Sequence, residues 1–418
     1  MRRATLASST ESRPPAALAS EIACLPYDVM NSDEAAVMAR GKEKSLLHIT
    51  RSEIDLPEGT DVHSEEVYKK ALENFIAWQK NGWLVQDDEP HFYIYAQTMD
   101  RRTQYGIVGA AAVEDYLKGV IRKHELTRPD KEEDRMVHVR ASNANIEPVF
   151  FAYPAVKELD KIVSKVTGKQ KAEYDFVAED GIGHHFWVVR DKATNERIEK
   201  LFAEKVPFTY VADGHHRTAA AALVGKEKKE KNHSHRGDEE YNFFLAVHFP
   251  DNQLRIIDYN RVVKDINGMS SADFMSKLRE SFDVKEKGEK IYKPAKLHNF
   301  SMYLEGKWYS LTARKGTFND SDPIGVLDVT VLAEKVLIPI LDIQDLRRSK
   351  RIDFVGGIRG LGELKRRVDS GEMKVAFALY PVSMKQLITI ADTGNIMPPK
   401  TTWFEPKLRS GLVIHKLD

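Results

Sequence analysis

The segment Tyr210–Ala221, YVADGHHRTAAA, places a carboxylate, two imidazoles and a guanidinium in one short turn. Its apolar start predicts a strand, Gly214 predicts a turn, and the alanine-rich end predicts a helix. The first N–H groups of a helix have no partner inside the helix, and the helix dipole adds partial positive charge there. The turn is therefore a natural seat for an anionic oxygen.

Four side chains of this turn suit chemistry on such an anion. His215, His216 and Arg217 supply hydrogen-bond donors, and an arginine can hold a phosphate through two parallel hydrogen bonds. Asp213 supplies a carboxylate that can act as a general base or hold a cation. The alternative is structural, with Asp213 as a helix cap and the histidines as ordinary loop residues. Two histidines and an arginine together at a helix start favour the functional interpretation.

A second candidate is the segment Lys123–Arg135, KHELTRPDKEEDR, which is dense in charge and poor in apolar anchors. A helix in its second half would place Lys131 and Arg135 on one face. Two like charges at this spacing are unfavourable unless an anion neutralises them, so we expect a site role. The alternative is a solvated loop and helix start, in which Glu132 and Glu133 favour the first turn.

A third candidate is the proline-interrupted segment Met397–Lys407, MPPKTTWFEPK. It keeps Lys400 beside Thr401 and Thr402, which suits a functional loop. The alternative is that the two aromatic residues after these threonines simply pack the segment against the fold.

Two familiar kinds of site are disfavoured. The paired histidines at His184–His185, His215–His216 and His233–His235 lack the helical ligand spacing of a zinc site, and the chain has no second cysteine. One member of the His184–His185 pair should pack inside, because neighbouring side chains of a strand point to opposite faces. Gly106–Ala110 and Phe354–Arg359 lack the glycine spacing of a Rossmann or P-loop phosphate site.

The whole-chain composition is that of an ordinary globular protein. The 418 residues contain 63 Lys+Arg and 63 Asp+Glu, and this balance disfavours a nucleic-acid coat or an anionic-membrane binder. We therefore expect neither a nucleic-acid nor a membrane partner. Apolar runs such as Val336–Leu341 are much shorter than a membrane-spanning helix. The single cysteine, Cys24, allows no intrachain disulfide and favours a reducing, cytoplasmic location.

Several elements that must position these candidates can be predicted from periodicity. Apolar residues at helical spacing predict a helix over Ser64–Asn81. Two apolar segments, His91–Gln97 and Gln104–Ala112, predict a hairpin, and Ser45–Thr50 reads as a short strand. Since strands occur both in hairpins and next to helices, we expect an α+β fold with mixed sheets and flanking helices.

The composition and the order of these predicted elements divide the chain into three parts. Residues 1–12, MRRATLASSTES, are expected to form a flexible tail; their composition is that of an organelle transit peptide, but the segment is short and lacks an amphipathic period. Residues 13–263 are expected to form the catalytic domain with the first two candidate segments. Residues 264–418 are expected to form a C-terminal α+β domain that contributes the third.

Taken together, the motifs resemble those of a widespread family of uncharacterised conserved proteins that is grouped with the ParB/sulfiredoxin-like superfamily and related to the free L-serine kinases. The similarity covers nearly the whole chain from Arg13. The matching stretches are RPP at Arg13–Pro15, LPYDVM at Leu25–Met30, LLHITRSEIDLP at Leu46–Pro57, HELTRPDKEEDR at His124–Arg135, ADGHHRTAA at Ala212–Ala220 and MPPKTTWFEPKLRSGL at Met397–Leu412.

The resemblance implies a ParB/sulfiredoxin-like core and a kinase that converts free L-serine to O-phospho-L-serine. It implies that Asp213 activates or orients the hydroxyl, and that Glu125 is a second carboxylate for base or magnesium work. The side chains and turn that would bind substrate or phosphate are His124, Thr127, Lys131, Arg135, Gly214, His215, His216, Arg217 and Lys400. Mg²⁺ is the expected cofactor, because phosphoryl transfer gathers negative charge.

The resemblance leaves the phosphoryl donor between ATP and pyrophosphate. Pyrophosphate is slightly favoured, because it is a compact donor that needs only cationic side chains and the sequence shows no adenine-pocket motif. Two alternatives remain open. One is a non-catalytic ParB-like module that binds a nucleotide or phosphate, and the other is a phosphoserine phosphatase running the reaction in reverse.

Overall fold

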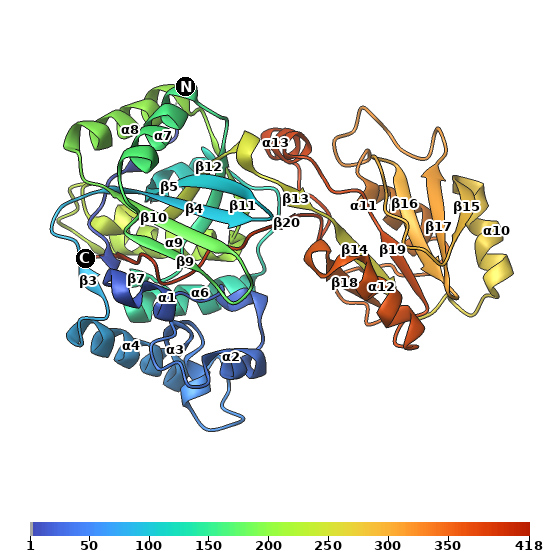
Figure 1. Ribbon diagram of the computed structural model, residues 1–418, viewed down its shortest axis with the longest axis horizontal. Coiled ribbons are helices and arrows are strands. Elements are labelled where there is room, and N and C mark those ends of the chain that lie inside the picture. The colour runs from blue at the N-terminus through green and yellow to red at the C-terminus, as the bar shows by residue number, and fades with distance from the viewer. Residues whose placement is uncertain (1–2) are drawn as a thin grey trace. The chain divides into compact units, whose positions relative to one another are not determined.

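Figure 1 shows the computed structural model, which describes residues 3–418. The chain forms two units. The first comprises the chain up to Leu254 together with Pro406–Asp418, and the second comprises Arg255–Glu405. Within residues 3–418, no helix combines the length and the apolar character needed to cross a membrane.

A nine-stranded mixed sheet forms the centre of the first unit, with the strand order β6-β11-β8-β12-β5-β4-β10-β9 and β1 paired to β5. Its antiparallel pairs include the β4–β5 hairpin, whereas β12–β8 and β11–β6 are parallel. The strands are β1 (Leu6–Ala7), β4 (Phe92–Met99), β5 (Arg102–Ala112), β6 (Ile121–Arg122), β8 (Val149–Tyr153), β9 (Tyr174–Val177), β10 (Gly183–Val189), β11 (Thr209–Asp213) and β12 (Phe243–Pro250).

Helices cover this sheet through buried apolar residues. Helices α7 and α8 share a core with strands β4 and β10, and α9 packs its alanines on β8, β11 and β12. The helices are α1 (Ala19–Ile22), α2 (Ser32–Ala39), α3 (Leu47–Thr50), α4 (Glu65–Lys80), α5 (Val113–Leu117), α6 (Pro129–Ser142), α7 (Lys157–Lys169), α8 (Lys192–Lys205) and α9 (His215–Lys231). Two short two-stranded sheets join β2 (Ser12–Arg13) to β3 (Val85–Gln86) and β7 (Ala144–Asn145) to β21 (His415–Lys416).

The second unit contains a six-stranded sheet of order β15-β17-β16-β19-β14-β18. Its strands are β14 (Tyr259–Val263), β15 (Phe282–Gly288), β16 (Asn299–Leu304), β17 (Lys307–Ala313), β18 (Ile352–Gly356) and β19 (Val375–Ala378). Its helices are α10 (Ser271–Ser281), α11 (Asp328–Leu332), α12 (Gly360–Asp369) and α13 (Met384–Asp392), and α11 runs on as a π-helical turn over Ala333–Leu337. A short pair joins β13 (Ile256–Ile257) to β20 (Trp403–Phe404).

The fold confirms the expected α+β class with mixed sheets and flanking helices. It also confirms the helix predicted over Ser64–Asn81, which is α4, and the predicted hairpin, which is β4–β5. A ParB/sulfiredoxin-like core stays a prediction. The strand predicted over Ser45–Thr50 is wrong, because this buried segment forms the helical turn α3, in which Thr50 donates its backbone N–H to the Leu46 carbonyl at 3.0 Å.

The prediction of a flexible tail is wrong for residues 3–12, and residues 1–2 lie outside the described residues. Leu6 is 1% exposed and pairs with Ala111 of β5. Glu11 is fully buried beside His415, at 3.2 Å. Backbone pairing and a long-range ion pair order this segment. Neither can be predicted from the local pattern of apolar residues.

The boundaries of the units differ from the expected domains 13–263 and 264–418. The chain crosses between units after Leu254, and the last residues return to the first unit. This return is built on backbone pairing of Ser410 with Cys24, of Ile414 with Ser12, and of β21 with β7.

Candidate functional site

The predicted strand–turn–helix is present as β11, Gly214 and α9. Gly214 has φ 86°, in the left-handed region that favours glycine. A Cβ at this position would stand 3.2 Å from the guanidinium of Arg217. The glycine therefore lets the chain turn and lets the Arg217 side chain fold back across the turn.

Arg217 is 7% exposed and lies among carboxylates. It donates a hydrogen bond from Nη1 to the Pro148 carbonyl at 2.6 Å. Its Nη2 lies 3.7 Å from Asp28 and 4.0 Å from Asp213. Burial opposes its charge, but Asp28, Glu147 and Asp213 raise the pKa of Arg217 above its ordinary value. Arg217 is therefore a fixed cation, and its Nε–H finds no acceptor among the described residues.

Asp213 forms the end of β11 and has a second cationic neighbour. Lys407 donates from Nζ to its Oδ2 at 3.2 Å, across 194 positions of sequence. Burial works against ionisation, but Lys407 and Arg217 lower the pKa of Asp213 below its ordinary value. Asp213 is therefore held as a carboxylate, and this makes it a weak base.

Glu125 lies beside two imidazole rings that carry no charge at neutral pH. His124 and His215 are stacked edge to face with ring centroids 4.6 Å apart. Burial lowers the pKa of each ring to about 3. In residues 3–418 these rings are the basic groups within 4.0 Å of the Glu125 carboxylate, at 4.0 Å and 3.9 Å, and the Glu125 side chain is 34% exposed. Glu125 therefore has no full cation to neutralise it.

His216 links the two candidate segments. The backbone N–H of Arg128 donates to its Nε2 at 3.0 Å, so the ring proton belongs on Nδ1. Burial lowers the pKa of His216 and keeps the ring neutral, with Nδ1–H as a donor. Thr127 is used within its own segment, because it donates to Glu132 at 2.7 Å.

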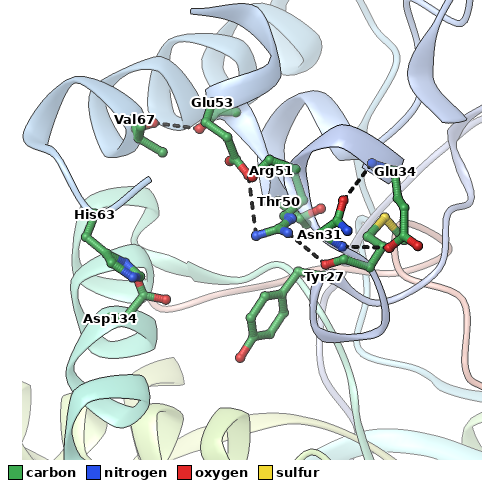
Figure 2. Close-up of polar contacts among 12 residues, drawn as sticks. Tyr27, Asn31, Glu34, Thr50, Arg51, Glu53, His63, Val67 and Asp134 are labelled. Carbon is green, nitrogen blue, oxygen red and sulfur yellow. Dashed lines mark hydrogen bonds and ion pairs between the residues drawn. The ribbon is translucent and has the colours of Figure 1, made fainter. Parts of the chain in front are cut away.

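Arg135 is neutralised inside the chain. It donates from Nε and Nη2 to Asp134 at 2.8 and 2.5 Å and lies over the Tyr27 ring at 3.8 Å. Asp134 also accepts from Tyr68 at 2.6 Å and bonds to His63 at 2.6 Å, and His63 and Asp134 face each other in Figure 2. Burial opposes ionisation, but Arg135 lowers the pKa of Asp134 to about 2.

The like-charge argument that led to Lys131 and Arg135 therefore does not hold, because the anion beside Arg135 is its own neighbour Asp134. Arg135 is still brought near the turn. It lines a cavity of about 30 Å³ together with Glu147 and Arg217. Lys131 lies on the same helix, α6, and its role stays a prediction.

The N-terminal segment that carries Tyr27 and Asp28 is fixed by the contacts in Figure 2. Asn31 and Glu34 cap α2 reciprocally, at 2.8 and 2.9 Å. Arg51 donates to the carbonyl of the residue before Asn31 at 2.7 Å. These bonds order the chain that follows the LPYDVM motif, and Asp28 within the motif lies 3.7 Å from Arg217 of α9.

Lys400 belongs to the second unit. It has φ 57°, its Nζ lies 5.7 Å from the Tyr259 ring, and its carbonyl accepts from Arg261 at 2.9 Å. The segment predicted as one functional loop, Met397–Lys407, is divided between the units, because Lys407 lies in the first.

Sequence reasoning missed three residues of this cluster, namely Asp28, Glu147 and Lys407. Asp28 and Lys407 lie inside the motifs LPYDVM and MPPKTTWFEPK, so the motifs carried the signal but the individual side chains were not singled out. Glu147 lies outside the quoted motifs, so no sequence pattern pointed to it. It accepts from the Tyr27 N–H and the Ser410 hydroxyl, both at 3.0 Å, and burial raises the pKa of its carboxyl.

Two further expectations concern histidines and glycines. His184 is buried and bonds to Tyr95 at 2.7 Å, while His185 bonds to Asp175 at 2.9 Å, as expected for neighbours on a strand. Within residues 3–418 no cluster of three or more His, Cys, Asp or Glu residues is arranged to hold a metal. Gly106 lies inside β5, where a Cβ would stand 2.7 Å from Val247.

Comparisons with known proteins give the following matches. A conserved hypothetical protein from Pyrococcus furiosus is 15% identical, over 73% of this chain and 95% of that chain, with a TM-score of 0.34. A free serine kinase in complex with AMP is 13% identical, over 73% and 92%, with a TM-score of 0.33. SbnI with a C-terminal truncation from Staphylococcus aureus is 11% identical, over 72% and 85%, with a TM-score of 0.38.

No curated protein matches the chain. The family model described as "Protein of unknown function (DUF1015)" matches residues 8–330, and the chain belongs to this family.

Proposed function

We propose that this protein is a phosphotransferase that moves a phosphoryl group from pyrophosphate or ATP to the hydroxyl of free L-serine, giving O-phospho-L-serine. The observation that carries the proposal is the meeting of two motifs at the start of α9. Glu125 lies 3.9 Å from His215, and the Arg128 N–H bonds to His216. The resemblance of both motifs to those of free L-serine kinases supplies the substrate.

The start of α9 supports a phosphoryl seat. Its first amides lack helical partners, and the positive end of the dipole points the same way. His216 offers its Nδ1–H, and Arg217 places a fixed positive charge behind the turn. Phosphoryl transfer needs positioned donors around spreading negative charge more than it needs covalent help from the protein.

Of the two carboxylates, Glu125 suits the general base better. Its neighbours are two neutral imidazoles, whereas Asp213 is held as a weak base by Lys407 and Arg217. Asp213 suits a positioning task, such as accepting a hydrogen bond from the hydroxyl or the ammonium of the amino acid. This assignment favours one of the two roles that the sequence left open for Asp213.

The proposed step balances as follows. The serine hydroxyl oxygen forms a bond to the transferred phosphorus while its proton passes to Glu125. The bond from phosphorus to the bridging oxygen of the donor breaks, and phosphate or ADP leaves. In the reverse reaction phosphate or ADP attacks the phosphorus of phosphoserine and serine leaves with a proton from Glu125. With water as the attacking group instead, the same side chains would serve a phosphoserine phosphatase, which is the alternative function.

The carboxylates present fit the expected Mg²⁺. This ion is commonly held by one or two carboxylates together with substrate phosphates, and it does not require a cluster of three protein ligands. Asp213 is the residue that would hold it, because Glu125, which has no lysine or arginine within 4.0 Å among residues 3–418, must stay free of the ion to act as the base. Bound there, the ion would neutralise charge on the phosphates.

Phosphorus NMR of the full chain with Mg²⁺ and L-serine tests the proposal, with pyrophosphate and ATP in separate tubes. A phosphoserine resonance in one tube identifies reaction, substrate and donor. Threonine and homoserine test the acceptor. Absence of product from every tube, with folded protein, contradicts the proposal and favours a binding module that does not turn over.

Matched variants assign the step. Glu125→Gln should lose at least 100-fold in rate, within the range that a general base contributes. Glu133→Gln is the control, because Glu133 is exposed and pairs with Arg140 on the same helix. A wild-type rate for folded Glu125→Gln would remove Glu125 from the role of base.

A further inference from the structure

A cavity of about 760 Å³ lies in the first unit, apart from the start of α9. One wall comes from the helical segment Ser20–Leu47, and the other comes from the Phe176–Asp180 end of β9. Arg409 completes the lining. The volume lies in the range of small-molecule sites, which are mostly apolar with a few placed polar groups. Among the described residues that line it, Asp213 and Glu125 do not occur.

Arg409 is the buried charge of this cavity. Its side chain is 6% exposed and is paired with Asp180, which is 42% exposed. A guanidinium has five N–H donors, so this single pairing leaves most of them for a ligand. Its position is fixed from behind, because its backbone N–H donates to the Tyr95 hydroxyl at 3.2 Å and Tyr95 bonds to His184 at 2.7 Å.

The rest of the cavity divides into an apolar floor and a charged rim. Leu47 is 1% exposed, and Leu25 and Met38 belong to the same apolar cluster. Across the rim, Lys42 pairs with Glu179 at 2.5 Å, with side chains 45% and 78% exposed. Such an exposed pair contributes little to stability, so opening the rim costs little.

The charges around the cavity nearly cancel. Its cations are Lys42, Lys44 and Arg409, and its acids are Glu21, Glu43, Glu179 and Asp180. This balance disfavours a phosphate or another multiply charged anion. A ligand that carries one positive and one negative group suits it better.

We infer that this cavity binds a free amino acid with an apolar side chain, with its carboxylate on Arg409, its ammonium on Asp180 and its side chain on the floor of Leu25, Met38 and Leu47. Planar guanidinium and carboxylate groups match through two parallel hydrogen bonds. Asp180 is placed to accept from the ammonium while it remains next to Arg409. The inference is independent of the proposed phosphotransfer, since no residue of that site takes part.

Calorimetric titration of the full chain with L-leucine and L-methionine tests the inference. Both should bind saturably, and both should bind at least tenfold more tightly than 4-methylpentanoate, which lacks the amine, and isopentylamine, which lacks the carboxylate. Equal affinity for either analogue, or no heat of binding from any amino acid at millimolar concentration, overturns it. Tighter binding of L-serine than of both apolar amino acids also overturns it.

Variants locate the site. Arg409→Lys and Asp180→Asn should each weaken binding at least tenfold, because Lys lacks the planar fork and Asn lacks the charge. Arg236→Lys and Asp238→Asn are the controls, since this pair is similar in kind but 76% and 72% exposed. Ala178→Phe places a ring in the cavity lining without removing either charge and should weaken binding at least tenfold, which keeps the test decisive if Arg409→Lys does not fold.

A last variant separates this site from the phosphotransfer site. Glu125→Gln should keep the amino-acid affinity of the wild type within about twofold while it removes phosphotransfer. If Glu125→Gln loses binding, the amino acid occupies the phosphotransfer site and the inference is wrong. If wild type shows binding but no phosphotransfer, the proposed function fails and the inference stands.

Discussion

Two buried arginines, Arg217 in the first unit and Arg261 in the second, differ in the groups that surround their buried positive charge. Each is nearly inaccessible, and each donates to backbone carbonyls, Arg217 to Pro148 and Arg261 to Tyr259 and Lys400. Arg217 lies among carboxylates, and its pKa is raised. Arg261 lies over an aromatic ring, and burial lowers its pKa to about 10.

This difference in surroundings separates a structural role for a buried arginine from a role in a functional site. Arg261 fixes two segments of its unit by bonding to their carbonyls, which is a structural task. Arg217 keeps an Nε–H that finds no acceptor among the described residues, while Asp28 and Asp213 lie 3.7 and 4.0 Å from its Nη2. Carboxylates gathered around one cation with an unused donor are expected at a site that handles charge.

The largest expected effect is at Arg217. Arg217→Met should lower the rate of phosphoserine formation about 1000-fold, because it removes the fixed positive charge behind the phosphoryl seat. Initial rates by phosphorus NMR check this. Arg140→Met is the control, since Arg140 is 36% exposed and pairs with Glu227. A loss of less than tenfold would show that Arg217 is as structural as Arg261.

A third buried cation, His415, can lose its charge in the accessible pH range, so its contribution to stability should depend on pH. His415 lies 3.2 Å from Glu11, and both are fully buried. Burial opposes the charge, but Glu11 raises the pKa of His415 to about 9. The unfolded histidine titrates near pH 6.5, so the stabilisation is complete below that pH and is lost as pH rises through about 9.

Over that window the unfolding free energy should fall by about 3 kcal/mol, at roughly 1.4 kcal/mol per pH unit. Urea unfolding at the two ends of the window measures this loss. Glu11→Gln should remove most of the pH dependence, because Glu11 raises the pKa of His415 more than Glu240 does, which lies 3.7 Å from the other ring nitrogen. An unchanged dependence in that variant would show that another group titrates.

Arg261→Met should cost about 2 kcal/mol of unfolding free energy, because the Tyr259 and Lys400 carbonyls lose their donor. Part of the cost is offset, since a buried charge without a carboxylate is also removed. Urea denaturation midpoints check this, with the exposed Arg255→Met as control. A stability equal to that of the wild type would mean that the bonds from Arg261 to the two carbonyls do not stabilise the unit.

The smallest expected effect is at Lys407, which shares Asp213 with Arg217. Lys407→Met should lower the rate about tenfold, or roughly 1.4 kcal/mol. Removing the cation raises the pKa of Asp213, so the acid limb of the rate profile should move to higher pH. Lys407→Arg keeps the charge and should restore the limb. A limb that stays in place in Lys407→Met would remove Asp213 from the groups that must be ionised.

Local patterns predicted elements whose causes are local. The helix α4 and the hairpin β4–β5 follow from apolar spacing and turn residues, and the turn at Gly214 follows from glycine before a helix. The short apolar run Ser45–Thr50 was misread, because period and length cannot separate a buried strand from a buried helical turn.

By itself the sequence determined the α+β class, the strand–turn–helix at Asp213–Arg217 and the charge-rich segment that faces it. Only the tertiary structure decided which charges meet. Asp28, Glu147 and Lys407 reach the turn from distant parts of the chain, and Asp134 takes the cation that was predicted for a phosphate. Periodicity and capping depend on neighbours within a few residues, whereas the partner of a buried charge is set by how distant segments pack.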